Sequence, residues 1–251
     1  MIDFVGAGPG STDLITVRGM RLLQEADVII YAGSLVNPEL LKFASGNAVI
    51  YDSSRLTLEE VTKIMIEAES EGKHTVRLHT GEPSIYGAVR EQMDVLDEHG
   101  IRYRSCPGVS ACFGAAAGLD IEYTLPGISQ SLIITRMEGK TPVPEPEKIE
   151  KLASHNASMA IYLSAGMLDK LQEKLLEGGY EPDTPAAIVY KATWPDERQY
   201  ICSVGTLSET GKANNITKTA VVLVGEAVTH RMFDRSKLYD PHFTTGYRQG
   251  I

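Results

Sequence analysis

The sequence has few cysteines, no long apolar run and a shortage of positive charge, and each shortage excludes a class of protein. Its three cysteines, at positions 106, 112 and 202, include no CxxC pair, so neither a disulfide framework nor a zinc site is indicated. No apolar run approaches the roughly 20 residues of a transmembrane helix, and no basic segment followed by an apolar one opens the chain. We therefore expect reduced thiols, no membrane association and a cytoplasmic location.

Basic residues are outnumbered, with 24 lysines and arginines against 33 aspartates and glutamates, for a net charge of -9. Nucleic acids and anionic membranes bind basic faces, so we expect neither as a partner. The six histidines show neither the spacing of metal ligands nor a place in a Ser-His-Asp triad. We expect structural roles for them and no protein metal site. Only His79, at the end of a predicted strand, stands apart.

Short apolar runs alternate with segments of helical periodicity in the first half of the chain. The 251 residues leave room for two modest domains, and 43% apolar residues are typical of a soluble globular protein. Thr57 and Glu60 have the spacing of a capping box, which predicts a helix from there to about Ser70. Strand, loop and helix in repetition indicate a mostly parallel sheet. The predicted strands are residues 2–5, 26–31, 49–52, 74–78 and 101–105.

The alternation of predicted strands and helices changes beyond residues 118–127, where Gly, Pro and Thr interrupt it. A Pro-rich polar segment, residues 136–147, predicts an irregular loop. A turn at residues 194–196 joins two predicted strands, which indicates an antiparallel pair and hence a mixed sheet. We predict an α/β protein of two α/β domains, residues 1–120 and 121–232, with a polar tail at residues 233–251. The strands expected in the second domain are residues 132–135, 159–164, 186–190, 199–203 and 219–224.

The first predicted strand ends in a glycine-rich turn, GAGPG at residues 6–10, and Ser11 and Asp13 suit the N-cap of a following helix. The dinucleotide fingerprint GxGxxG fails here, because Ser11 stands at the third glycine position and Pro9 lacks an N–H. No Lys-Ser/Thr pair follows, so the turn is not a P-loop. A tight turn that needs glycine explains it equally well. An oxidoreductase that binds NAD through this turn remains an alternative function, which calorimetry with NAD would decide.

Two further loops, residues 80–87 and 107–111, follow predicted strands. Parallel sheets bind ligands at the carboxyl ends of their strands. Gly81 would let the backbone approach a ligand, and Glu82 could accept a hydrogen bond from a hydroxyl or amine. The alternative is a solvated loop in which Glu82 is a charge at a helix start.

Six segments, taken together and in this order, resemble the tetrapyrrole methyltransferases, the S-adenosylmethionine-dependent enzymes of sirohaem and cobalamin synthesis. Two more, at residues 31–41 and 130–145, are similar to the C-11 methyltransferases of precorrin-4 and cobalt-precorrin-4. The resemblance spans residues 5–228. The six segments are VGAGPGSTDLITVRG at 5–19, TGEPSIYG at 80–87, PGVSA at 107–111, IYLSAG at 161–166, AIVYKAT at 187–193 and TAVVLVGEAV at 219–228.

This resemblance implies two α/β domains with an active-site cleft between them, and a homodimer. It also implies that Gly6, Gly8 and Gly10 lie at the floor of a trough for the substrate. Carried over by position, the cofactor contacts are Pro9, Thr80, Gly81, Glu82, Ile85, Ser110, Ala111, Leu163, Ala192, Thr219 and Ala220.

The chain departs from the family pattern in three of these places. Many relatives have Gly-Gly-Asp where this chain has Thr80-Gly81-Glu82, so an acidic side chain is kept but lengthened. Leu163 replaces a common methionine, and Thr219 replaces a frequent proline or serine.

The implied activity is methyl transfer from S-adenosylmethionine to ring carbon C-11 of precorrin-4 or cobalt-precorrin-4, giving precorrin-5A or its cobalt form and S-adenosylhomocysteine. The alternatives are transfer to another precorrin carbon or to uroporphyrinogen III. The donor is already activated and the ring carbon is enamine-like, so orientation and exclusion of water are the main tasks. We therefore predict no catalytic nucleophile or metal ligand, because any cobalt arrives inside the macrocycle.

A tetrapyrrole with several carboxylates needs local positive charge, and arginine binds carboxylates with two parallel hydrogen bonds. Arg136, directly after a predicted strand in a segment that marks the subgroup, is the predicted substrate contact. The wider set of basic residues near predicted strand ends or helix starts is Arg18, Arg21, Arg55, Arg77, Arg90, Arg136 and Lys140.

Overall fold

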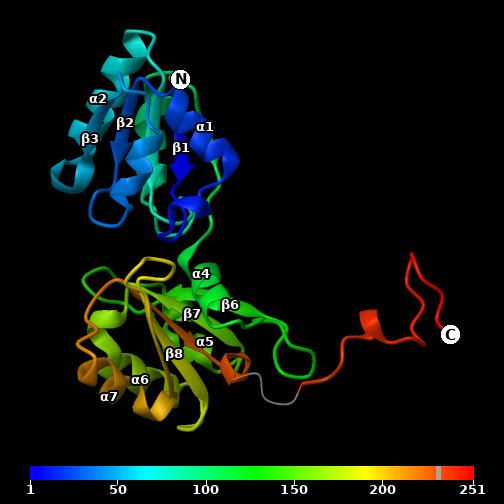
Figure 1. Cartoon of the computed structure of the whole chain (residues 1–251). Helices are drawn as coiled ribbons and strands as arrows, with labels where there is room; N and C mark the ends of the chain where they lie inside the picture. Colours follow the sequence, from blue (N-terminus) through cyan, green and yellow to red (C-terminus); the bar gives the residue numbers. More distant parts are fainter. Residues whose placement is uncertain (230–232) are drawn as a thin grey trace. The chain divides into compact units, whose positions relative to one another are not determined.

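A computed structural model describes residues 1–229 and 233–251, and the chain divides into two compact units (Figure 1). Unit 1 consists of Met1–Gly114 and Lys191–Asp196, and unit 2 of Ala115–Tyr190 and Glu197–Ile251. The predicted domain limits at residues 120 and 233 stay predictions, and residue 232 lies outside the described residues.

Unit 1 contains a parallel sheet of five strands in the order β3-β2-β4-β1-β5, which confirms the parallel sheet expected for the first half of the chain. The 3-10 helix Pro38–Phe43 and helix α1 pack on one face of this sheet, and α2 and α3 pack on the other. The strands are β1 (Ile2–Gly6), β2 (Val28–Tyr31), β3 (Val49–Asp52), β4 (Thr75–His79) and β5 (Tyr103–Cys106). The helices are α1 (Val17–Glu25), α2 (Leu58–Ser70) and α3 (Val89–Glu98).

The buried strands of unit 1 send alternate side chains to the two faces. Phe4 of β1 packs towards α2 and α3, whereas Val5 packs in the cluster that includes α1, as the period of two requires. The Thr57–Glu60 capping box is present at the start of α2, as predicted. Helix α1 does not begin near Ser11 or Asp13: its N-cap is Thr16, whose hydroxyl accepts a hydrogen bond from the Gly19 N–H at 3.0 Å.

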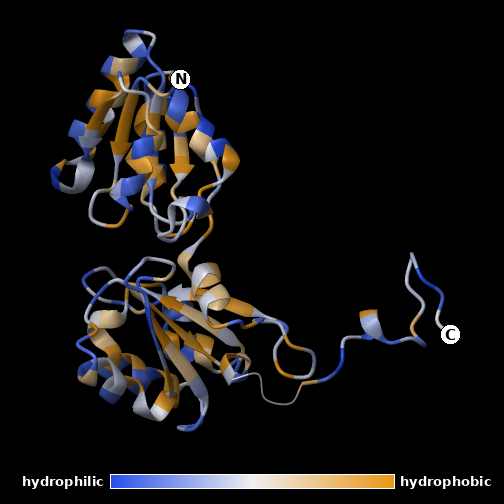
Figure 2. Cartoon of the chain, viewed as in Figure 1, coloured by the Kyte–Doolittle hydropathy of each residue, from blue (hydrophilic) through white to orange (hydrophobic). Residues whose placement is uncertain are grey.

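Unit 2 contains a mixed sheet in the order β6-β7-β10-β8-β9, as expected, in which only β6 and β7 are parallel neighbours. Its strands are β6 (Leu132–Arg136), β7 (Ser158–Tyr162), β8 (Pro185–Tyr190), β9 (Arg198–Ser203) and β10 (Ala220–Val224). Its helices are α5 (Ile149–Ala153), α6 (Leu168–Glu177) and α7 (Leu207–Ala213), and they share one apolar core with the sheet. Figure 2 shows the hydrophobic residues concentrated in the strands of both units.

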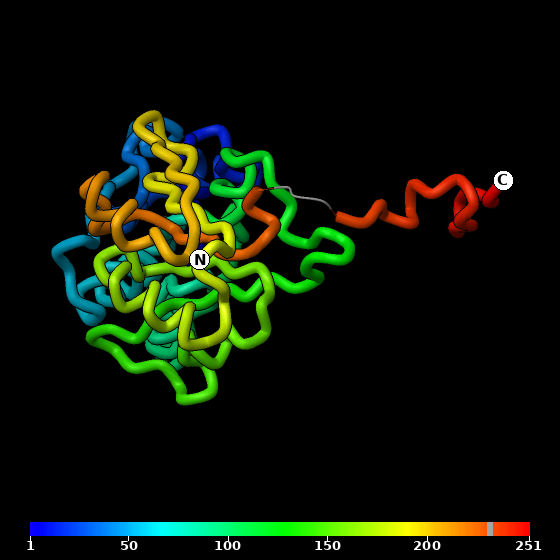
Figure 3. Tube along the Cα trace, turned by 90° about the horizontal axis from the view of Figure 1, so that it is seen from below, coloured from blue at the N-terminus to red at the C-terminus, as the bar shows by residue number. Residues whose placement is uncertain are grey.

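The short helix α4 (Ala111–Gly118) contains the point at which the chain passes from unit 1 to unit 2. Residues 233–251, red in Figure 3, contain one turn of 3-10 helix, Lys237–Tyr239. Within the part of the chain that the structure describes, no helix is long and apolar enough to cross a membrane.

Candidate functional site

The loops predicted from the sequence converge at the carboxyl edge of the sheet of unit 1. Strand β1 lies between β4 and β5, so the loops that follow these three strands are neighbours. From β1 the chain continues to β2, towards the β3 edge of the sheet, whereas from β4 it continues to β5, at the opposite edge. In open α/β sheets, ligands bind at the topological switch point, where neighbouring strands lead to opposite edges.

Four glycines join these loops through their backbones. Gly8 and Gly81 form an antiparallel bridge, in which the Gly81 N–H donates to the Gly8 carbonyl at 2.9 Å. A Cβ atom on Gly108 would lie 2.1 Å from the Gly81 oxygen, and one on Gly6 would lie 2.6 Å from the Gly108 nitrogen. Any side chain at these two positions would force the loops apart, so glycine is required for the packing itself.

Glu82 ties two of the loops together. One carboxylate oxygen accepts a hydrogen bond from the Ser84 N–H at 2.9 Å, and the other accepts one from the Gly108 N–H at 2.8 Å. Burial acts to raise the pKa of this carboxyl, but the hydrogen bonds from Ser84 and Gly108 outweigh it and hold the pKa of Glu82 below its usual range. Glu82 therefore positions the loop after β5 relative to the loop after β4.

The carbonyl groups of the glycine-rich turn are already used by other side chains. The indole Nε1–H of Trp194 donates to the Pro9 carbonyl at 3.1 Å, and the Asn37 amide donates to the Gly10 carbonyl at 2.9 Å. A Cβ on Gly10 would lie 2.1 Å from the Trp194 ring. The turn is thus a packing surface for Trp194.

Ala192 lies in the segment Lys191–Asp196, which belongs to unit 1. It is buried, and its neighbours Lys191 and Thr193 both have left-handed backbones, with φ of 49° and 67°. The Thr193 hydroxyl accepts a hydrogen bond from the Ser11 N–H at 3.0 Å. This segment is therefore held in a strained conformation against the glycine-rich turn.

Left-handed backbone conformations gather at the predicted cofactor contacts. Nine non-glycine residues with positive φ are found among the described residues, and three of them are Asp or Asn, which tolerate this conformation. Such strain costs about 1–3 kcal/mol per residue and persists where the surroundings demand it, often at ligand sites. Of the other six residues, five are predicted contacts or their sequence neighbours: Tyr86, Leu163, Lys191, Thr193 and Thr219.

In unit 2, the predicted residues lie at one edge of the mixed sheet. Val222 of β10 pairs with Ile161 of β7, and continuing this antiparallel register places Ala220 opposite Leu163. The parallel register of β6 and β7 places Arg136 at the same edge. Leu163 is 65% exposed, so this leucine combines a strained backbone with an apolar side chain that is free to contact a ligand.

The Arg136 guanidinium is engaged by its own loop. Its N–H groups donate to the carbonyls of Met137 at 3.2 Å, Thr141 at 3.3 Å and Pro142 at 2.9 Å. Arg136 thus closes the loop that follows β6, and its contact with substrate stays a prediction.

The other predicted basic residues do not form one cluster in the described contacts. Arg77 is buried, and Arg90 pairs with Asp94 and Asp97 along α3. Like Arg90, the members Arg18, Arg21, Arg55 and Lys140 are exposed.

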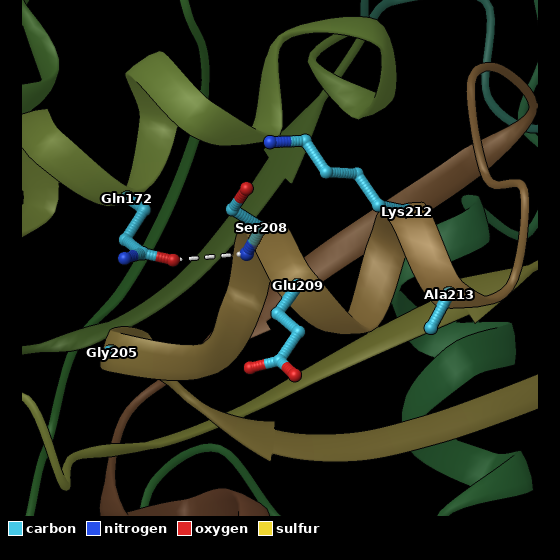
Figure 4. A pocket seen from close by; sticks show the side chains of 6 residues that line it. All are labelled: Gln172, Gly205, Ser208, Glu209, Lys212 and Ala213. Carbon is cyan, nitrogen blue, oxygen red and sulfur yellow. Dashed lines mark hydrogen bonds between the residues drawn. The ribbon is translucent and has the colours of Figure 1, made fainter.

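A surface hollow of about 470 Å³ between α6 and α7 contains none of the predicted residues (Figure 4). Its walls include Gln172, whose side-chain oxygen accepts a hydrogen bond from the Ser208 N–H at 2.9 Å. Across residues 1–229 and 233–251, no group of three or more His, Cys, Asp or Glu residues is placed to hold a metal ion.

Residues 1–208 match the family described as Tetrapyrrole (Corrin/Porphyrin) Methylases. The chain belongs to this family. Among tetrapyrrole methylases, it is 50% identical to the cobalt-precorrin-4 C(11)-methyltransferase of Methanocaldococcus jannaschii, over 99% of this chain and 96% of that protein. It is 42% identical to the precorrin-4 C(11)-methyltransferase of Mycobacterium tuberculosis, over 95% of each.

A solved structure of a cobalt-precorrin-4 methyltransferase superimposes with a TM-score of 0.88 at 43% identity, covering 90% of this chain and 95% of that one. The tetrapyrrole methylase fold expected from the sequence is thereby confirmed. It accounts for the absence of a dinucleotide fingerprint and argues against an NAD-dependent oxidoreductase.

Trp194 is a residue of this region that the sequence patterns do not single out. The sequence predicts it only as part of a turn between two strands, and β8 and β9 confirm that turn. Its contact with Pro9 bridges 185 positions of sequence. The available signal was that the only tryptophan of the chain directly follows the AIVYKAT segment.

Proposed function

We propose that this protein transfers the methyl group of S-adenosylmethionine to C-11 of a precorrin-4 substrate in cobalamin biosynthesis and releases S-adenosylhomocysteine. The observation that carries the proposal is the similarity of 42–50% identity, over nearly the whole chain, to proteins named for this reaction.

The proposed cofactor contacts in unit 1 are Pro9, Thr80, Gly81, Glu82, Ile85, Ser110, Ala111 and Ala192, and in unit 2 they are Leu163, Thr219 and Ala220. The glycine bridge, the Glu82 hydrogen bonds and the strained segments support this set, because they fix backbone positions before a ligand arrives. Gly6, Gly8, Gly10 and Arg136 are the proposed substrate contacts.

The chain's contribution to the reaction is orientation. A sulfonium methyl group transfers in line to a nucleophilic carbon, and holding the two reactants in that geometry can supply about 7–11 kcal/mol. Apolar surroundings, to which the exposed Leu163 contributes, keep water from the sulfonium. No side chain acts as a nucleophile in this scheme. A substitution that abolished turnover but preserved the fold and both binding constants would contradict it.

We favour cobalt-precorrin-4 over metal-free precorrin-4 as the substrate. The relatives at 50% and 44% identity are named for the cobalt form, whereas those named for the metal-free form are at 39–43%. Parallel assays with the two substrates test this choice, and a higher kcat/KM for the metal-free form would reverse it.

We also propose that the enzyme is a cytoplasmic homodimer. Sedimentation equilibrium of the purified chain should give twice the monomer mass of 27.4 kDa, and a monomer at micromolar concentration would contradict this.

The decisive experiment uses S-adenosylmethionine with a ¹³C-labelled methyl group. The protein is incubated with precorrin-4 or cobalt-precorrin-4, and NMR of the product should place the label on C-11. A label on another ring carbon, or transfer to uroporphyrinogen III, would assign the protein to a different reaction of the same fold. NAD is the control ligand, and calorimetry should detect no binding.

A further inference from the structure

A buried cation lies beneath the carboxyl edge of the sheet of unit 1. Arg77, on β4, is only 6% exposed. Its Nε–H donates to the Gln92 side-chain oxygen at 3.0 Å, and one terminal N–H donates to the Ile30 carbonyl at 3.2 Å. Burial lowers the pKa of Arg77 to about 10, so the group stays charged at neutral pH. No acidic side chain among the described residues forms an ion pair with it, whereas buried charges are ordinarily paired.

His79 lies two residues further along β4, on the same face of the sheet. Its ring is stacked on Phe4 with 6.2 Å between centroids, and its side chain is 5% exposed. Its Nε2 atom is buried and has no hydrogen-bond partner in the described structure. Burial and the charge of Arg77 lower the pKa of His79 to about 3, so the imidazole is neutral and can donate one N–H.

The amino-terminal turn of α3 contacts Arg77 through Gln92. Gln92 accepts from Arg77 and also donates to the Ala88 carbonyl at 3.0 Å, so the guanidinium lies beside the first turn of this helix. Ala88, the N-cap residue, has φ of 48° and makes no side-chain capping bond. A helix N-terminus carries partial positive charge. The guanidinium and the helix N-terminus both attract an anion, and the imidazole can donate to one in the tautomer that carries its hydrogen on Nε2.

We propose that Arg77, His79 and the first turn of α3 form a binding site for one carboxylate of the tetrapyrrole substrate, which enters when the strained turn Tyr86–Ala88 shifts. The identity of the ligand rests on the proposed function. The chemistry of the site, recognition of a small oxyanion, does not. A free inorganic anion has the same chemistry, and the experiments separate the two sources.

The first experiment measures anion binding without turnover. Acetate and inorganic phosphate are titrated at constant ionic strength, and Tm is followed by circular dichroism. Acetate should raise Tm in the wild type and in Arg102→Met, an exposed arginine of the same unit, but not in Arg77→Met. The ¹⁵N resonance of the His79 side chain should shift on addition of acetate. An equal response of Tm in Arg77→Met would overturn the site.

The second experiment tests the source of the carboxylate. In Arg77→Met, the KM for the tetrapyrrole should rise about tenfold or more while the Kd of S-adenosylmethionine stays unchanged, since a charge-assisted contact is lost. Arg77→Lys should recover part of this loss. The tetrapyrrole should also compete with acetate in the wild type. Acetate binding without such competition would overturn the assignment to substrate.

His79→Phe provides an independent variant in case Arg77→Met does not fold. It keeps the ring stacked on Phe4 and removes only the donor. Its response to acetate should be weaker than that of the wild type, and an unchanged response together with an unchanged tetrapyrrole KM would overturn the role of His79. Because these measurements include anion binding alone, they can succeed even if methyl transfer occurs at a carbon other than C-11.

Discussion

Glu82→Gln is the substitution whose effect follows most directly from the geometry. The carboxylate accepts one backbone N–H on each oxygen, from Ser84 and from Gly108. A glutamine has one acceptor oxygen, so its amide N–H₂ would face the other N–H, donor against donor. The variant keeps the size of the side chain and loses one of the two loop connections.

The cost can be derived from the bond that is lost. A hydrogen bond to a charged group contributes about 1.5–3 kcal/mol net, and Glu82 is partly exposed, which favours the lower end of this range. We expect a loss of about 2 kcal/mol in the free energy of unfolding, or about 4–8 °C in Tm for a chain of this size. Cofactor affinity should fall about tenfold, because the loop before Ser110 is no longer held against the loop that contains Gly81.

Urea unfolding followed by circular dichroism and calorimetry with S-adenosylmethionine measure these two effects. Glu98→Gln, an exposed acid at the end of α3, is the control and should leave both unchanged. The sign of the pH dependence also follows. The folded pKa of Glu82 is depressed, so its contribution is present above the unfolded value of about 4.3 and is lost as pH falls through the folded pKa. Equal urea midpoints for variant and wild type at pH 7 would refute the loop-tying role.

Three further predictions address other contacts of the site. Gly108→Ala should cost about 1–3 kcal/mol in unfolding free energy by pressing on the Gly81 carbonyl, whereas Gly46→Ala, which meets open space, should change it by less than about 0.5 kcal/mol in the same denaturation assay. Trp194→Phe keeps a ring and removes one hydrogen bond, so calorimetry should show cofactor affinity about 2–10-fold weaker; unchanged affinity would contradict the positioning role of the indole. Arg136→Ala should weaken tetrapyrrole binding about tenfold in a titration, and full retention of affinity would end its assignment as a substrate contact.

The fold was largely predictable because its strongest signals are local. The buried strands appear as short apolar runs, and the Thr57 capping box marks its helix from sequence alone. The sequence predicts the start of α1 too early, because Ser11 is the N-cap residue of a separate 3-10 helix, Thr12–Leu14, and the extended residues Ile15 and Thr16 precede α1. Helices α5 and α7 span only five and seven residues, too few for helical periodicity to be recognised.

The meeting of these loops was predictable from the sequence, but the individual contacts were not. Strand ends in a parallel sheet indicate which loops meet, and Gly8 and Gly81 lie in two such loops. Their roles as ligand contacts come from the family resemblance and stay predictions. No local pattern states that Glu82 reaches Gly108, 26 residues away. The burial of Arg77 was equally invisible, because an arginine at a strand end is ordinarily expected in solvent.

The position of Trp194 has a practical consequence. It is the only tryptophan of the chain, and its ring lies against Gly10 with its N–H on the Pro9 carbonyl. Fluorescence excited at 295 nm therefore comes from one known position in the molecule. Its emission wavelength and quenching by acrylamide would report the state of the glycine-rich turn directly, with no label and no engineered probe.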